Sequence, residues 1–488
     1  MKKHSYIRII SILFCLILLF QQCSKSSRGT VVPPGGGGGG ITPPRNDVDF
    51  WLTKANQTVL LQKQTGTISF TASSSSTYPV IAVDASSVYQ TMDGFGYNLT
   101  GGSAYLLNRL DAASRTSLLN EIFGSGPDGI GVSYLRISIA ASDLSQQVFS
   151  YDDMPAGQTD PNLNNFSLSK DTVDLIPVLK QILQINPALK IIASPWSPPT
   201  WMKDNGNSMG GYLLPQYYST YANYFVKYIQ SMSAKGITIN AVTIQNEPQH
   251  GGNNPSMLMT APQQAEFIKT NLGPAFQAAA LSTKIIIWDH NCDNAAYPIS
   301  ILNDAAARFF IDGSAFHLYA GDISALSGVH AAFPDKNLYM TEQWTGSNGS
   351  FDGDFKWHMK NVIIGSVRNW SKLALEWNLA SDQNYEPHTP GGCTQCKGAI
   401  TINGNTITRN VSYYIIAQAS KFVPAGSKRI SSTQDGGLFT AAFLRPDGMK
   451  VLIVLNEGSA DITFNILFNG KSALTSIPAG SAGTFTWQ

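Results

Sequence analysis

The run Ala241-Val242-Thr243-Ile244-Gln245 is short, apolar and rich in β-branched residues, and it ends in the polar pair Asn246-Glu247. A short apolar run bounded by polar residues is typical of a strand that is buried on both faces, as in a parallel sheet. Seven more runs of this kind follow the same pattern, at residues 93–97, 134–139, 190–194, 284–288, 315–319, 337–341 and 372–377. We therefore expect eight buried strands.

Segments with helical periodicity lie between these runs. One helical face is formed at steps of three and four residues by Leu214, Tyr217, Tyr218, Tyr221, Phe225, Tyr228 and Ile229, and a second by Leu106, Leu107, Leu110, Leu118, Leu119, Ile122 and Phe123. Eight strands that alternate with helices predict the α/β class and a (β/α)8 TIM barrel over residues 91–420.

Both flanks of the barrel show a different pattern. Residues 48–90 and 421–488 alternate apolar and polar side chains and contain turns, as in Met449-Lys450-Val451-Leu452-Ile453-Val454. Alternation of this kind is typical of antiparallel strands with one buried face. We predict a side β-sandwich domain that is formed from both chain ends.

The first residues resemble a targeting segment. Lys2, Lys3 and Arg8 precede an apolar run at 9–20 that is too short to span a bilayer, so residues 1–22 are interpreted as a signal peptide. The sequence before Cys23 is similar to a lipoprotein cleavage site, although Gln22 replaces the usual small residue; ordinary cleavage nearby is the alternative. Residues 23–47, with six consecutive glycines, predict a flexible tether.

These features predict an exported lipoprotein of the outer membrane, at the cell surface or in the periplasm, that contacts the membrane only through its lipid. The composition has 33 basic and 32 acidic residues and 43% hydrophobic residues, which excludes a disordered chain and a polycationic nucleic-acid binder. We expect a monomer with no nucleic-acid partner.

No cofactor or metal is expected. The seven histidines show no ligand spacing, and the glycine run is not a phosphate loop because no Lys-Ser/Thr follows it. Cys393 and Cys396 are a disulfide candidate as a local staple, with a redox pair and a zinc site as alternatives.

A TIM barrel places its chemistry at the C-terminal ends of its strands. Glu247 and Glu342 both follow apolar runs and lie 95 residues apart, which puts them on the fourth and seventh strands. A single glutamate in such a place is more often a salt-bridge partner or a helix cap. Two that face one mouth indicate glycoside hydrolysis, in which one carboxyl group protonates the leaving oxygen and the other attacks or activates water.

The spaced motifs resemble glycoside hydrolase family 30, the family that contains glucocerebrosidase. They are Asp93-Gly94-Phe95-Gly96, Ala193-Ser194-Pro195-Trp196-Ser197-Pro198-Pro199-Thr200-Trp201-Met202-Lys203, Asn246-Glu247-Pro248, Phe316-His317-Leu318-Tyr319, Thr341-Glu342 and Trp377-Asn378-Leu379. The resemblance implies a retaining mechanism on β-linked sugars, with Glu247 as acid/base and Glu342 as nucleophile.

The resemblance also implies roles for the neighbouring residues. Arg136 supports the nucleophile and keeps it ionised, with a plain buried ion pair as the alternative. His317 and Tyr319 are expected near the nucleophile as hydrogen-bond partners; a core histidine is the alternative for His317. Asn246 is placed where it can donate to the sugar 2-hydroxyl group.

Four more residues are expected to bind substrate. We expect Asp143 to accept hydrogen bonds from hydroxyl groups of the glycone, and the indoles of Trp196 and Trp377 to stack on sugar faces. Trp344 follows the nucleophile and is a candidate for the next subsite, with core packing as the alternative.

The substrate prediction depends on the segment after the eighth run. Residues 390–398 depart from the glucocerebrosidase pattern and resemble the endo-β-1,6-glucanase branch, which implies β-1,6-glucan or its oligosaccharides as substrate. A β-glucosidase or glucosylceramidase is the first alternative and a xylanase the second. A surface glycan-binding protein is the alternative outside enzymes, although a pure binder needs neither glutamate.

Overall fold

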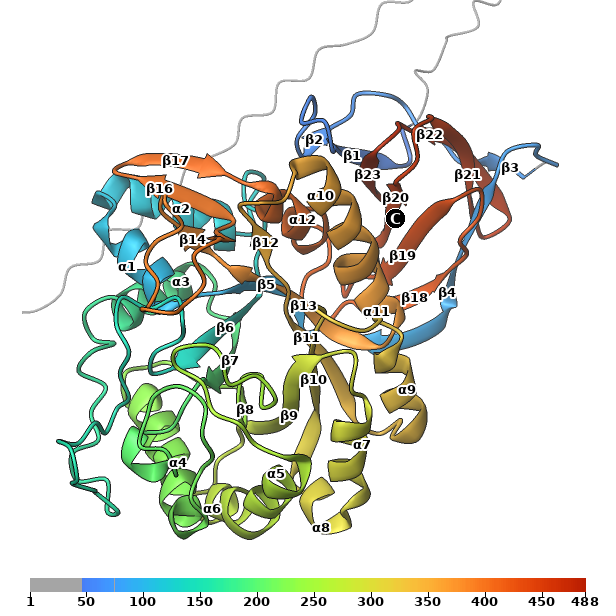
Figure 1. Ribbon diagram of the computed structural model, residues 1–488. Helices are drawn as coiled ribbons and strands as arrows, with labels where there is room; N and C mark the ends of the chain where they lie inside the picture. The colour runs from blue at the N-terminus through green and yellow to red at the C-terminus, as the bar shows by residue number, and fades with distance from the viewer. Residues whose placement is uncertain (1–45, 74) are drawn as a thin grey trace, which may run out of the picture. The chain divides into compact units, whose positions relative to one another are not determined.

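The computed structural model describes residues 46–73 and 75–488 (Figure 1). The predicted signal peptide, the lipid attachment at Cys23 and nearly all of the tether lie outside the described residues. Within the described part of the chain, no helix combines the length and apolar character that a membrane crossing requires.

The eight predicted strands form a closed parallel barrel, which confirms the predicted fold. The barrel order is β10-β11-β13-β5-β6-β7-β8-β9. The strands span Gly94–Asn98 (β5), Tyr134–Ile139 (β6), Lys190–Pro195 (β7), Ala241–Thr243 (β8), Lys284–Asn291 (β9), Ile311–His317 (β10), Asn337–Glu342 (β11) and Ser371–Asn378 (β13). Strand β8 is two residues shorter than predicted, and β10 ends two residues before Tyr319.

Helices cover the outside of the barrel (Figure 1). They are α1 (Gly101–Arg109), α2 (Ala112–Phe123), α3 (Leu175–Ile185), α4 (Tyr218–Ala234), α5 (Ala261–Phe267), α6 (Gly273–Ala278), α7 (Ala296–Asn303), α8 (Ala305–Arg308), α9 (Ala325–Ala332), α10 (Phe351–His358), α11 (Ser366–Arg368) and α12 (Val411–Ser420). The turn η2 (Pro215–Tyr217) and the π-helical segments η3 (Ile268–Leu272) and η4 (Met359–Gly365) adjoin these helices, and η1 (Thr200–Met202) is a separate turn after β7.

Of the two helical faces expected from the sequence, one lies mainly on a single helix and the other is divided between two helices. The aromatic face of α4 packs into the core, where Tyr221, Phe225 and Tyr228 are fully buried. The stretch around Leu110 instead divides into α1 and α2, because Asp111 accepts a hydrogen bond from the Ser114 amide and so begins a new helix.

Both chain ends enter one β domain of ten strands. Its order is β2-β1-β23-β20-β19-β18-β4-β21-β22-β3. The strands are β1 (Asp49–Lys54), β2 (Gln62–Lys63), β3 (Thr71–Ala72), β4 (Val80–Thr91), β18 (Lys428–Ser432), β19 (Leu438–Leu444), β20 (Lys450–Asn456), β21 (Ile462–Phe468), β22 (Lys471–Ile477) and β23 (Ser481–Trp487). The antiparallel pairing of β1 with β23 joins the two ends, as the sequence predicts.

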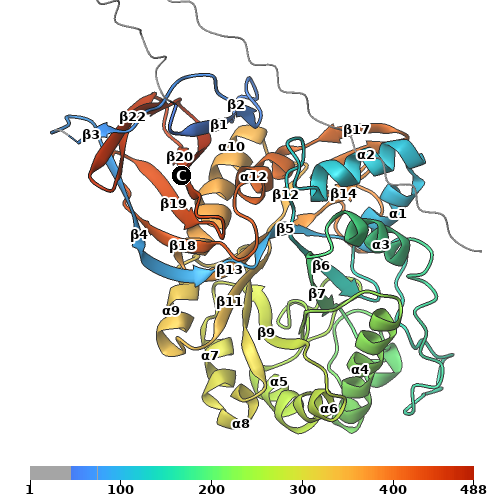
Figure 2. The same cartoon turned by 180° about the vertical axis from the view of Figure 1, so that it is seen from behind.

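A helix and an apolar cluster connect the barrel to this β domain. Helix α12 contacts both β5 and β23 (Figure 2), and Gln418 on α12 donates to the Ala482 carbonyl at 2.8 Å. Buried side chains of β19 and β20, among them Phe443 and Ile453, belong to the same apolar cluster as the barrel core. The site at the barrel mouth therefore rests on a continuous packed support.

Short strands tie the loops at the barrel mouth together. Strand β12 (Thr345–Gly346), after β11, pairs with β15 (Cys396–Lys397), after β13. Strands β14 (Ala380–Ser381), β16 (Ile400–Asn403) and β17 (Thr406–Arg409) form a second small sheet in the segment after β13.

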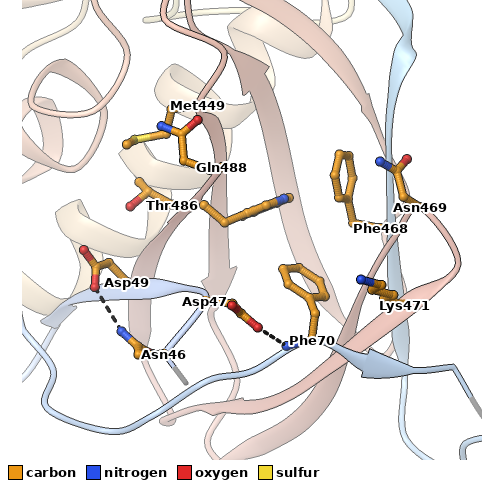
Figure 3. A pocket seen from close by; sticks show the side chains of 11 residues that line it. Asn46, Asp47, Asp49, Phe70, Met449, Phe468, Asn469, Lys471, Thr486 and Gln488 are labelled. Carbon is orange, nitrogen blue, oxygen red and sulfur yellow. Dashed lines mark hydrogen bonds between the residues drawn. The ribbon is translucent and has the colours of Figure 1, made fainter. Parts of the chain in front are cut away.

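The β domain contains a cavity of its own. A space of about 520 Å³ opens between the first strand and the last strands and is lined by Phe70, Phe468 and Trp487 together with polar side chains such as Asp49 and Lys471 (Figure 3). None of its lining residues lines the pocket at the barrel mouth.

Candidate active site

Glu247 and Glu342 converge on one pocket at the C-terminal ends of the barrel strands. The pocket has a volume of about 280 Å³, and both glutamates line it although each is less than a tenth exposed. A carboxylate oxygen of Glu247 and one of Glu342 lie within 4.8 Å of each other. This is the short separation found where the second carboxylate attacks carbon directly, without room for an intervening water.

The backbone around Glu247 is specialised for this position. Glu247 follows the short strand β8 and has a φ of +46°, in the left-handed region that a residue with a side chain rarely occupies. Its amide donates to the Asp289 carbonyl at 3.0 Å, and the Asn246 amide donates to the Pro195 carbonyl at 2.8 Å. These bonds to the neighbouring strands hold the strained turn in place.

Arg136 lies beneath the nucleophile candidate. Its side chain is fully buried, and Nη1 donates to Oε2 of Glu342 at 2.6 Å while Nη2 donates to Oδ2 of Asp289 at 2.8 Å. A guanidinium remains charged in proteins, so it stabilises the ionised form of both carboxylates. Arg136 thus contacts Glu342 as expected, in a larger ion cluster than the sequence indicated.

Asn246 is oriented by the same guanidinium. Nη2 of Arg136 donates to Oδ1 of Asn246 at 2.7 Å, and Asn246 lines the pocket. Because guanidinium groups only donate, the amide oxygen faces Arg136 and the NH₂ group is left to donate elsewhere. This leaves Asn246 able to donate to a sugar hydroxyl group.

His317 and Tyr319 each form a hydrogen bond with a different glutamate. The Tyr319 hydroxyl donates to Oε1 of Glu342 at 2.9 Å, as expected. Nδ1 of His317 is hydrogen-bonded to Oε1 of Glu247 at 3.0 Å and lies 3.7 Å from Glu342, so its hydrogen-bond partner is the acid/base candidate rather than the nucleophile. Its other nitrogen, Nε2, faces Oδ1 of Asp289 at 3.2 Å.

The two glutamates differ in their electrostatic environments. Burial raises the pKa of Glu342, with His317 and Arg136 opposing and Glu247 adding to the rise. Burial also acts to raise the pKa of Glu247, but the hydrogen bond and charge of His317 outweigh it and the pKa lies below its usual value. Two carboxyl groups this close ionise in separate steps, so over a range of pH they share one proton.

Asp289, which directly follows the apolar run at residues 284–288, is a site residue to which the sequence alone assigned no role. It has no solvent exposure and accepts from Ser194, Thr243 and Thr341 in addition to Arg136 and His317. Burial would raise its pKa, but the Arg136 charge and these donors hold the pKa well below its usual range. A strand-end position alone does not distinguish such a buried anchor from a substrate contact.

Aromatic side chains form one wall of the pocket. Trp196 and Trp377 stack with ring centroids 5.5 Å apart, and Trp344 lines the same pocket. The Arg136 guanidinium lies 4.8 Å from the Trp196 ring centroid. Trp196 therefore packs on its neighbours as well as facing the pocket.

Asp143 and the disulfide candidate complete this wall. Cys393 and Cys396 are joined by a disulfide, both line the pocket, and the Cys393 amide faces Oδ2 of Asp143 at 3.4 Å. Burial first, and then the charge of Glu342, raise the pKa of Asp143 to about 7.

Four further residues of the pocket were assigned no role from the sequence. They are His250, Asn253, His290 and Asn291. His250 and Asn253 lie in the loop after β8, and His290 and Asn291 are the last two residues of β9, so no common spacing marks them. Burial lowers the pKa of His290 to about 4, which leaves its imidazole neutral beside Glu247.

Among the described residues, Glu247, His317 and Glu342 form a group whose ligand atoms are close enough to hold a metal ion. Burial lowers the pKa of His317, but the surrounding carboxylates outweigh it and raise the pKa to about 10. A metal-bound imidazole must be neutral and needs a free nitrogen, whereas both nitrogens of His317 face carboxylates. The cluster is suited to proton transfer rather than metal binding.

A TIM barrel with paired carboxylates and an aromatic wall at its mouth defines a glycoside hydrolase. Residues 92–423 match the Glycosyl hydrolase family 30 TIM-barrel domain, and residues 426–485 match the Glycosyl hydrolase family 30 beta sandwich domain. The chain belongs to glycoside hydrolase family 30, which confirms the family predicted from the motifs.

The chain is similar to proteins named endo-1,6-β-glucanases and to a glucosylceramidase. The endo-1,6-beta-D-glucanase BGN16.3 of Trichoderma harzianum is 34% identical, with 84% of this chain and 87% of that protein covered. The solved structure of the endo-beta1,6-glucanase BT3312 is 36% identical and superposes with a TM-score of 0.84, covering 91% of this chain and 99% of that chain. The lysosomal acid glucosylceramidase of Mus musculus is 29% identical, with 82% of each chain covered.

Proposed function

We propose that the protein is an endo-β-1,6-glucanase that retains the anomeric configuration through double displacement. The observation that carries the mechanism is the approach of the Glu247 and Glu342 carboxylate oxygens to within 4.8 Å. The linkage is supported by the similarity to proteins named endo-1,6-β-glucanases, at 34% and 36% identity.

In the first step a carboxylate oxygen of Glu342 attacks the anomeric carbon, and Glu247 gives a proton to the glycosidic oxygen as that bond breaks. A glycosyl ester on Glu342 forms and the leaving sugar departs as an alcohol. The two glutamates share one proton in the free site. A bound sugar places its anomeric carbon at Glu342 and its glycosidic oxygen, which accepts a proton, at Glu247. Substrate binding therefore favours the protonated form of Glu247.

In the second step the Glu247 carboxylate removes a proton from water, and the resulting oxygen nucleophile attacks the anomeric carbon. The ester bond to Glu342 breaks, and the sugar leaves with its original configuration. Arg136 and Tyr319 stabilise the departing carboxylate through the bonds that they make in the free site. The Asn246 amide group donates to the 2-hydroxyl group, a bond that strengthens as positive charge develops on the sugar.

A substrate panel tests the proposal. The protein is incubated with linear β-1,6-glucan, β-1,3-glucan, xylan and glucosylceramide, the products are sized, and the anomer released first is identified by proton NMR. We expect β-1,6-glucan alone to give a ladder of oligosaccharides with the β-anomer first. Release of glucose only would favour a β-glucosidase or glucosylceramidase, cleavage of xylan alone would favour a xylanase, and binding without cleavage would favour a glycan-binding protein.

We also propose that the protein is an exported lipoprotein acylated at Cys23. The basic start, the short apolar run and the sequence before Cys23 support this proposal. The Cys23→Ser variant is expected to move from the membrane fraction to the soluble fraction of cells, whereas wild-type protein should incorporate labelled fatty acid. Membrane association of the variant equal to that of wild type would contradict the proposal. The same cell fractions, analysed by size-exclusion chromatography, test the expected monomer.

A further inference from the structure

The leaving-group side of the catalytic pocket begins at Glu247, because the acid must lie beside the oxygen that departs. Asp143, Trp196 and Trp377 lie together on the disulfide side of the pocket, whereas His250 and His290 lie near Glu247. An endo-acting enzyme must hold sugars on both sides of the cleaved bond. Glu247 therefore lies at the border between the sugar held in the pocket and the leaving chain.

A groove of about 620 Å³ begins at the turn that carries Glu247. Pro248 and Gln249 line the groove, whereas Glu247 and His250 line the catalytic pocket, so one four-residue turn separates the two spaces. The turn is closed by a hydrogen bond from the His250 amide to the Glu247 carbonyl at 2.8 Å. Beyond it the groove runs between the segment before α5 and the start of α7.

Backbone bonds hold the walls of this groove. The Met259 amide donates to the Pro248 carbonyl, and the Leu258 amide donates to the Gly211 carbonyl, each at 2.8 Å. The Tyr297 hydroxyl, from α7, donates to the Met259 carbonyl at 2.8 Å and so joins the two walls. The groove is thus largely formed before any ligand binds.

The lining is suited to a neutral, hydroxylated ligand. No charged side chain lines the groove, and Tyr212 presents an aromatic ring that is 37% exposed. Asn294 donates to Oε1 of Gln249 at 3.1 Å, which leaves the Gln249 NH₂ group and the Asn294 oxygen without a partner among the described residues. An aromatic face beside free amide groups binds the C–H face and the hydroxyl groups of a sugar.

We propose that this groove binds glucosyl residues of the leaving chain, with Tyr212 as the stacking platform and Gln249 and Asn294 as hydrogen-bond partners. This inference rests on the proposed endo-β-1,6-glucanase function and extends it to the residues that set the preference for long chains. The groove makes the contacts that a short substrate cannot reach. Its contribution grows with the number of sugars beyond the cleaved bond.

The test compares Tyr212→Ala, Tyr212→Phe and wild type on β-1,6-linked oligosaccharides from the disaccharide upward and on the polymer. We expect Tyr212→Ala to lower the ratio of kcat/KM for long over short chains by about 3- to 10-fold, the effect of losing one stacking contact. Tyr212→Phe keeps the ring and should retain the wild-type ratio. Tyr78→Ala, which removes a 48%-exposed tyrosine from the β domain, is the matched control. It should change kcat/KM neither for long chains nor for short chains.

An unchanged ratio in Tyr212→Ala would overturn the inference. An equal loss of kcat/KM at every chain length would also overturn it, because that result indicates a general structural role. If wild type does not cleave β-1,6-glucan, the proposed function fails instead, and the same variants on the β-linked chains that it does cleave still decide whether the groove binds the leaving chain.

Discussion

The Asp289 carboxylate lies 2.8 Å from Nη2 of Arg136, and neither side chain has any solvent exposure. Asp289 also faces His317, so a single buried anion balances both cations beneath Glu247 and Glu342. Arg136 and His317 in turn each reach one glutamate. The position and ionisation of Glu247 and Glu342 therefore depend on a residue that is closed off from solvent.

The Asp289→Asn variant tests this dependence. An amide would turn at least one NH₂ hydrogen toward donors that now converge on a carboxylate, and it would remove the negative charge that Arg136 and His317 share. Loss of one member of a buried ion pair costs about 3 to 5 kcal/mol in the free energy of unfolding. We expect a loss of this size in urea unfolding and an altered pH profile of kcat/KM. Asp335→Asn, at a 69%-exposed side chain, is the control, and equal behaviour of the two variants would contradict the role of Asp289.

The separate roles of the two glutamates can be tested by substitution. Glu342→Gln removes the attacking group and should lower kcat by several orders of magnitude on every substrate while oligosaccharide binding persists. Glu247→Gln removes the general acid, a loss of about 10²- to 10⁴-fold for alkyl leaving groups. With an aryl glycoside whose leaving group needs no protonation, formation of the glycosyl ester by Glu247→Gln should remain fast and appear as a burst. An equal loss of kcat/KM on substrates with alkyl and with aryl leaving groups would contradict the assignment of Glu247.

Folding stability should depend on His317 in a defined direction. Its pKa is raised from 6.5 to about 10 in the folded protein, so its contribution is full below pH 6.5 and is lost as the pH rises through 10. The difference in free energy of unfolding between wild type and His317→Gln should therefore shrink from pH 6.5 to pH 10. Urea unfolding at a series of pH values measures it. Parallel curves for the two proteins would show that His317 is not charged in the folded state.

Ionisation of Asp143 should make kcat/KM rise with pH near neutrality. Burial, followed by the charge of Glu342, raises the pKa of Asp143 to about 7, so this side chain is neutral below that pH and charged above it. A carboxylate beside the sugar stabilises the positive charge of the transition state better than a carboxylic acid does. We expect kcat/KM of wild type to contain a rise with an apparent pKa near 7 that Asp143→Asn lacks. Persistence of this rise in Asp143→Asn would assign it to another group.

The sequence predicts the barrel because buried parallel strands need continuous apolar runs, and a barrel mouth collects whatever polar residues end those runs. Glu247 and Glu342 could be identified for that reason. The partner of His317 could not, because the choice between two glutamates a few ångströms apart depends on side-chain direction. Asp289 directly follows an apolar run in the sequence, and only its burial shows that it serves as an anchor. The groove with Tyr212 combines segments after β7, β8 and β9, whose spacing follows no period.

The Cys393–Cys396 disulfide lies where it should affect substrate binding more than stability. It closes a loop of only four residues, so it restricts the unfolded chain little. Cys396 packs in the same cluster as Trp196 and Trp377, and β15 pairs with β12 directly after the nucleophile strand. We expect the variant with both cysteines replaced by serine to raise KM for β-1,6-glucan several-fold, with a small change in Tm. Replacement of Ser86 and Ser87 by alanine, on β4 and outside the lining of the pocket, is the control for two small substitutions. A large fall in Tm with unchanged KM would show that the disulfide serves the fold rather than the pocket wall.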